Sequence, residues 1–117
     1  MAAVARVIDQ PALGVVIDTE HLSRMTLGEL SLQREVLGLF DRQADMLLPR
    51  IRQGAPTAAA SAHTLKGSAV GIGAFKVARA VEEVEQAKDG QIAAAVDTLA
   101  AVLDEAKAEI ARLLQAA

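Results

Sequence analysis

Apolar residues recur at alternating spacings of four and three along the final part of this chain. The seam comprises Ile92, Val96, Leu99, Leu103, Ala106, Ile110 and Leu113. Such a heptad pattern predicts a helix over about residues 91–115, which must bury one continuous stripe against other helices. Only 2% of the 117 residues are aromatic although 52% are hydrophobic. We therefore expect an aliphatic core, and the abundant alanines favour helix over sheet.

Turn signals divide the preceding sequence into further helices. Asp18 or Thr19 can cap a short helix that ends near residue 25. Glycine and proline then mark the breaks, at Gln53–Gly54–Ala55–Pro56, at Gly71 and Gly73, and at Asp89–Gly90. The helices expected between these breaks span about residues 27–53, 56–72 and 75–88.

Amphipathic helices joined by short turns favour one compact arrangement. We predict an all-α fold, an antiparallel up-down four-helix bundle over residues 18–117 with an extra short N-terminal helix. Pro11 and Gly14 interrupt residues 1–17, which are expected to form a poorly defined N-terminal arm. This arm could hold a short helix over residues 1–8 or dock loosely on the bundle.

The long helix over about 27–53 carries two apolar stripes that together cover half of its circumference or more. The first stripe comprises Leu30, Leu37, Phe40, Ala44, Leu47 and Ile51. The second stripe comprises Leu32, Val36, Leu39, Gln43 and Met46. An ordinary surface helix shows an apolar face of about 100°. Either two neighbouring helices bury both stripes, or part of the second stripe stays exposed as a docking surface.

The helix over about 56–72 presents His63 on the side opposite to its core. The expected core side comprises Ala58, Ala62, Leu65, Ala69 and Ile72. The face around His63 comprises Ala59, Lys66, Gly67, Val70 and Ala74. A glycine inside a helix costs about 1 kcal/mol relative to alanine, so Gly67 needs a reason. A close helix–helix approach is one explanation, but we favour open access to the imidazole.

An exposed imidazole is a competent nucleophile near neutral pH, since its ordinary pKa is about 6.5. A phosphoryl group on His63 would carry roughly −1.5 to −2 charges, and the Lys66 ammonium one turn later could hold it. A metal site is disfavoured because no Cys, His, Asp or Glu lies three or four residues after His63. The second histidine, His21, is expected to be a surface or packing residue.

The run His63–Thr64–Leu65–Lys66–Gly67–Ser68–Ala69 resembles the signature of histidine phosphotransfer (HPt) domains. The resemblance extends over about residues 19–115. It implies that His63 is the phosphoacceptor, that Lys66 steadies the phosphoryl oxygens and that Gly67 leaves room for a partner. Gln43 would lie near the histidine, and Ser68 would orient the helix or simply pack. The second glycine at Val70–Gly71 departs from the family's usual pattern.

The resemblance also implies partners and a mechanism. His63 would take a phosphoryl group from a receiver-domain aspartate of a hybrid histidine kinase and pass it to a response regulator. No cofactor is expected in the chain itself, and Mg²⁺ would come from the receiver. The docking patch would comprise Ala59, Val70, Ala74, Leu32, Val36, Leu39 and Met46.

Composition and charge argue against several other classes of function. The net charge of −3 and a pI near 5.3 argue against nucleic acid, and no apolar run approaches the roughly 20 residues of a membrane span. The absence of cysteine excludes disulfides and fits a cytoplasmic protein. We expect a monomer, although the heptad seam would also permit a dimer.

Two alternatives remain open at the level of sequence. One is a helical adaptor that binds a kinase without relaying phosphate. The other is the phosphoacceptor domain of a chemotaxis-type histidine kinase, although Met1 and the end at Ala117 favour a stand-alone protein. No Walker-type loop or kinase signature is present, so autonomous kinase activity is not expected. The hypothesis that the chain is an enzyme with a substrate pocket is the least favoured.

Overall fold

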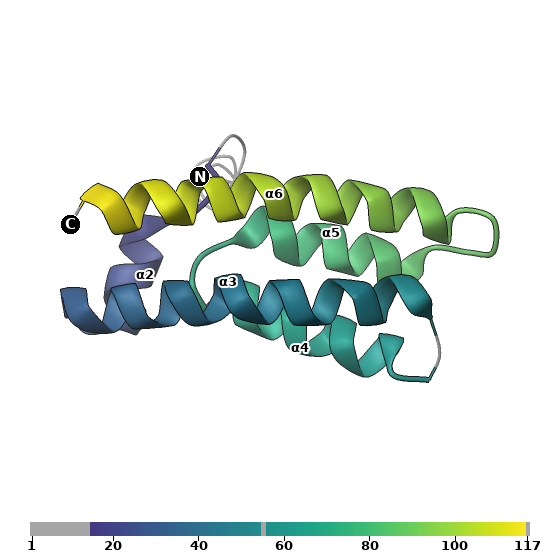
Figure 1. Cartoon of the computed structure of the whole chain (residues 1–117), viewed down its shortest axis with the longest axis horizontal. Coiled ribbons are helices and arrows are strands. Elements are labelled where there is room, and N and C mark those ends of the chain that lie inside the picture. The colour runs from purple at the N-terminus through teal and green to yellow at the C-terminus, as the bar shows by residue number, and fades with distance from the viewer. Residues whose placement is uncertain (1–14, 55, 117) are drawn as a thin grey trace, which may run out of the picture.

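The computed structural model describes residues 15–54 and 56–116, and within them every regular element is a helix. The helices are α2 (Thr19–Met25), α3 (Leu30–Gln53), α4 (Ala58–Gly71), α5 (Phe75–Gln86) and α6 (Ile92–Ala116). Helix α3 contacts α4 and α6, and α5 contacts the same two helices. The four therefore close into the predicted antiparallel bundle, shown in Figure 1. The conformation expected for residues 1–14 lies outside the described residues.

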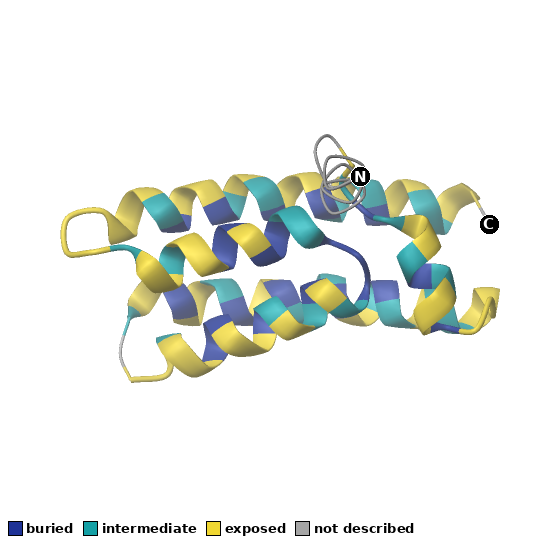
Figure 2. Cartoon of the chain, turned by 180° about the vertical axis from the view of Figure 1, so that it is seen from behind, coloured by how far each residue is buried: buried dark blue, intermediate teal, exposed yellow. Residues whose placement is uncertain are grey.

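The helices of the bundle differ in length: α3 and α6 have 24 and 25 residues, whereas α4 and α5 have 14 and 12. At one end the two long helices extend past their shorter neighbours, and α2 lies across the space between them (Figures 1 and 2). Leu22 of α2 is buried there. The short N-terminal helix thus closes one end of the core.

Branched aliphatic side chains and alanines fill the interior, as the composition predicts. Phe40, Leu65, Leu99, Leu103 and Ile110 are among the largest fully buried side chains. Buried positions recur at intervals along each helix of the bundle (Figure 2), and their apolar side chains form one core cluster. The heptad seam of α6 is buried from Val96 to Ile110, whereas Ile92 is exposed and Leu113 is half-buried because they lie near the ends of the helix.

The connection between α4 and α5 is fixed to the segment that precedes α2. The Asp18 N–H donates a hydrogen bond to the Gly73 carbonyl at 2.9 Å, and the Asp18 carboxylate accepts one from the His21 N–H at 3.0 Å. Asp18 is therefore the N-cap of α2. The His21 ring packs edge-on against Phe75, with ring centroids 5.1 Å apart, so of the two expected roles, surface or packing residue, it has the packing role.

The long helix starts later than its pattern predicts. Leu27 and Gly28 have positive φ angles of 54° and 74°, so the chain turns there and α3 begins at Leu30. Leu30 lies in the first turn and is 68% exposed, so its assignment to the buried first stripe was wrong. The other five residues of that stripe are buried.

The second stripe of α3 is only partly covered. Leu39 is 54% exposed and Met46 is 52% exposed, while Leu32, Val36 and Gln43 are half-buried. The interpretation that two neighbouring helices bury both stripes is therefore wrong. An apolar strip of α3 remains on the surface next to α4.

Smaller differences lie at the other helix ends. Helix α4 begins at Ala58 rather than near 56, and α5 ends at Gln86 rather than near 88. Because α4 ends at Gly71, the helical projection that placed Ala74 beside His63 does not apply. Ala74 is fully buried, and its N–H donates to the Ala69 carbonyl in the turn. Its assignment to the docking face was wrong.

Candidate functional site

Helix α4 separates a buried side from an exposed side. Ala62, Leu65 and Ala69 are buried against the bundle, whereas His63 is exposed in the middle of the helix. The backbone of the 14-residue helix therefore holds His63 on a rigid element. Its imidazole is open to a molecule that approaches from solvent.

Small or absent side chains surround the histidine on this exposed side. Ala59 and Gly67 are exposed, and Val70 is 40% exposed. A Cβ atom built on Gly67 would meet no heavy atom within 4 Å. Intramolecular packing does not require a glycine at this position, so the explanation by a close helix–helix approach was wrong. Gly67 therefore leaves an open surface beside the imidazole.

Lys66 lies on the flank of α4 that faces α5. Its Nζ is 3.5 Å from Glu82 Oε2 and 3.6 Å from Glu85 Oε1, and its side chain is partly buried. The sequence predicted an ammonium one turn after the histidine but missed these two carboxylates. Glu82 and Glu85 are three residues apart on α5 and so share one helical face. That spacing is visible in the sequence, but nothing in the sequence specifies which face meets α4.

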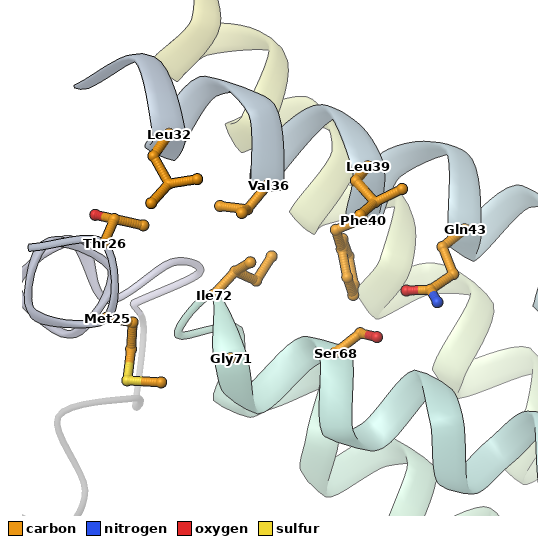
Figure 3. Close-up of a pocket in the computed structure, with 10 residues that line it drawn as sticks. All are labelled: Met25, Thr26, Leu32, Val36, Leu39, Phe40, Gln43, Ser68, Gly71 and Ile72. Atoms are coloured by element: carbon orange, nitrogen blue, oxygen red, sulfur yellow. The ribbon is translucent and has the colours of Figure 1, made fainter. Parts of the chain in front are cut away.

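On its opposite flank α4 borders an apolar hollow of about 280 Å³. Helices α2, α3 and α4 and the turn after α4 supply its walls (Figure 3). The hollow is lined by Met25, Thr26, Leu32, Val36, Leu39, Phe40, Gln43, Ser68, Gly71 and Ile72. Four residues of the second α3 stripe are in this set. The exposed strip of α3 and the exposed side of α4 are therefore neighbouring parts of one surface.

Two predicted supporting residues meet in this hollow. Gln43 reaches from α3 towards α4, and Ser68 points from α4 into the same gap (Figure 3). Both are half-buried. Met25, the last residue of α2, and its C-cap Thr26 were not predicted to take part. The only sequence signal for them is an apolar residue at the end of a short helix. Met46, on the exposed second stripe, lies outside the lining.

The site contains no evident metal cage. Within residues 15–54 and 56–116, no group of three or more His, Cys, Asp or Glu side chains could hold a metal ion. No helix in the described part of the chain is both long and apolar enough to cross a bilayer. The chemistry that the surface offers is an exposed imidazole, an ammonium held by two carboxylates, and an apolar hollow.

Comparisons with known proteins point to one family. The family model described as the Hpt domain matches residues 35–116, which include most of α3 and all of α4, α5 and α6. The fold is also similar to the crystal structure of histidine phosphotransferase ShpA from Caulobacter crescentus, with a TM-score of 0.69. The two sequences are 31% identical, and the match covers 83% of this chain and 88% of that chain. The comparison with curated proteins found no match.

Proposed function

Because this chain belongs to the Hpt domain family and so carries a phosphoryl group on a histidine in a phosphorelay, we propose that His63 is that histidine. The observation that supports this assignment is its exposure in the middle of α4, beside an open Gly67. The other histidine, His21, is in contact with Phe75, and its Nε2 is buried. An imidazole in that environment is a poor target for a second protein.

The reaction consists of two matched transfers. An imidazole nitrogen of His63 attacks the phosphorus of a receiver's aspartyl phosphate, a nitrogen–phosphorus bond forms, and the bond to the aspartate oxygen breaks. The phosphoryl group then leaves His63 when an aspartate of a second receiver attacks it, which restores the imidazole. Phosphoryl transfer depends mostly on positioning and charge neutralisation. Mg²⁺ is expected from the receiver domain, whose acidic site would hold it.

Receiver domains are the partners that the Hpt family implies, and we propose where they bind. The docking surface would consist of the exposed strip of α3 with Leu39 and Met46, the hollow that contains Leu32 and Val36, and the exposed residues Ala59 and Val70 of α4. A surface of this kind suits a transient, partly apolar interface. Gly67 would let the receiver backbone or a loop approach the imidazole.

The finer assignments belong to the same proposal. Lys66 would neutralise phosphoryl charge, while Gln43 and Ser68 would support the site from the hollow. The partners would be hybrid histidine kinases and response regulators, and the chain would act as a cytoplasmic monomer without autonomous kinase activity. The lack of cysteine fits a reducing compartment.

Labelling by a phosphorylated receiver tests the assignment. His63→Gln should abolish transfer of radiolabelled phosphate while the helical circular dichroism stays unchanged, since His63 is exposed. The chain contains two histidines, so His21 remains in this variant as an internal control. Labelled His63→Gln protein would contradict the assignment.

A further inference from the structure

Lys66 is held more loosely than the two other lysines that form ion pairs in the described residues, Lys76 and Lys107. Its Nζ lies 3.5 and 3.6 Å from two carboxylate oxygens of α5. In contrast, Lys76 is 3.0 Å from Glu105, and Lys107 is 2.8 Å from Asp45. Charge-assisted hydrogen bonds are typically 2.7–2.9 Å long. The Lys66 ammonium therefore rests between Glu82 and Glu85 in their combined field without a tight bond to either.

This arrangement leaves an excess of negative charge at the flank of α4. Two carboxylates face one ammonium, and the Glu82 side chain is about half exposed. Lysine has a flexible stem and a compact charge that can move between neighbouring anions. A phosphoryl group on His63, one turn away on α4, would bring roughly −1.5 to −2 charges to the same region. The single ammonium can then pair either with the two carboxylates of α5 or with the phosphoryl group.

We propose that Glu82 and Glu85 are positioning residues that compete with the phosphoryl group on His63 for the Lys66 ammonium. This inference rests on the proposed function of His63. Before phosphorylation the two carboxylates hold the ammonium on the α5 side of α4. After phosphorylation they draw it back, which limits how strongly Lys66 can stabilise phosphohistidine.

Such competition has a direct use in a carrier. An interaction that stabilises the phosphorylated state without equally stabilising the transition state slows the onward transfer. The carboxylates would therefore keep the phosphoryl group exchangeable between receivers. Removing their charges should shift the equilibrium so that more of the phosphoryl group stays on the chain.

The measurement is the equilibrium constant for transfer from a phosphorylated receiver to the chain, obtained with radiolabelled phosphate. Glu82→Gln/Glu85→Gln should raise this constant by roughly three- to tenfold, as expected when a partly exposed ammonium loses two weak ion pairs. Glu83→Gln is the control for loss of a carboxylate from α5, because it removes one negative charge from the same helix near Arg79 and Thr98 on the α5–α6 surface. It should change the constant by less than about twofold.

The same pair of substitutions in a Lys66→Met background separates competition for the ammonium from direct repulsion of the phosphoryl group. Competition predicts that the shift falls to less than about twofold when Lys66 is absent. The inference would be overturned if the equilibrium constant shifted equally with and without Lys66. It would also be overturned if the constant did not shift in the chain that retains Lys66. A wild-type chain that accepts no phosphoryl group would instead overturn the proposed function, and this inference with it. Thermal unfolding of each variant checks that the bundle remains folded.

Discussion

Asp18 and Gly73, which are distant in the sequence, lie in backbone contact and fasten α2 to the turn that ends α4. The Asp18 N–H donates to the Gly73 carbonyl at 2.9 Å. Gly73 has a φ of +81°, and a Cβ at this position would lie 2.6 Å from the Asp18 carbonyl oxygen. Since Met25 at the end of α2 and its C-cap Thr26 line the hollow beside α4, this contact links α2 to the candidate docking surface.

Gly73→Ala should therefore loosen α2 as well as lower stability. The left-handed backbone costs an alanine about 1 kcal/mol, and the clash with Asp18 adds to it, so we expect a loss of roughly 2–4 kcal/mol in the free energy of unfolding. Urea denaturation followed by circular dichroism measures this loss. Gly90→Ala is the matched control, because its φ is +89° but its Cβ would meet nothing within 4 Å. Equal losses in the two variants would contradict the role of the contact.

Gly67→Leu should slow phosphoryl transfer without lowering the stability of the bundle. The new side chain meets open space in the chain itself, and leucine is a better helix former than glycine, so the free energy of unfolding should stay constant or rise by up to about 1 kcal/mol. Phosphoryl transfer from a receiver should nevertheless fall at least tenfold because the side chain stands beside His63.

Gly38→Ala provides the comparison for Gly67, because its Cβ would make only an ordinary contact of 3.5 Å with Arg42. We expect a similar gain in stability with an unchanged rate of transfer. If Gly67→Leu protein unfolded more easily, or transferred at the wild-type rate, the access explanation for Gly67 would be wrong.

Leu39→Asp should weaken receiver binding. Leu39 is 54% exposed and lines the hollow, so a carboxylate there would remove apolar contact area at little expense to the core. We expect about a tenfold rise in the KM for the phosphorylated receiver with kcat changed by less than about twofold. Leu30→Asp, on the same helix at 68% exposure but outside this hollow, should leave both constants unchanged. Equal effects of the two substitutions would place the docking surface elsewhere.

Lys107 gives the bundle a pH-dependent link between α6 and α3. Burial alone would lower the pKa of this lysine, but hydrogen bonds and attraction from Asp41 and Asp45 outweigh it and raise the pKa above its ordinary value. A raised pKa means that the stabilisation is complete below the unfolded pKa of about 10.4 and disappears as the pH rises through the folded value.

Lys107→Met should thus destabilise the protein at pH 7 by less than about 1 kcal/mol, because the pair is partly exposed. The difference from the wild type should shrink as the pH rises above about 10. Urea denaturation at neutral and alkaline pH measures it. A difference that stays constant across this range would show that the pair does not contribute through its charge.

The parts of this structure that depend on helical periodicity could be predicted from the sequence. The seam from Val96 to Ile110 and the motif around His63 predicted the bundle and the exposed imidazole, because both depend only on helical spacing. Helix ends were harder to predict. Leu27 and Leu30 continue an apolar pattern past a turn that requires positive φ, and Ala74 continues one past the end of α4.

Contacts between helices were beyond the reach of a single sequence. The pairing of Lys66 with Glu82 and Glu85 depends on how α5 is rotated against α4, which is decided by packing of the whole core. The wall that α2 contributes to the hollow depends likewise on the Asp18–Gly73 contact. Neither arrangement can be predicted from a local sequence pattern.

Pulse-chase transfer of a phosphoryl group through the chain tests the relay most directly. The protein would be labelled by a radioactive phosphorylated receiver, purified away from it, and mixed with an unphosphorylated second receiver. A relay through His63 predicts that the label is on His63 after the first step and moves to the aspartate of the second receiver after mixing. Label that stays on the chain, or that leaves only as free phosphate at the rate seen without a second receiver, would contradict it.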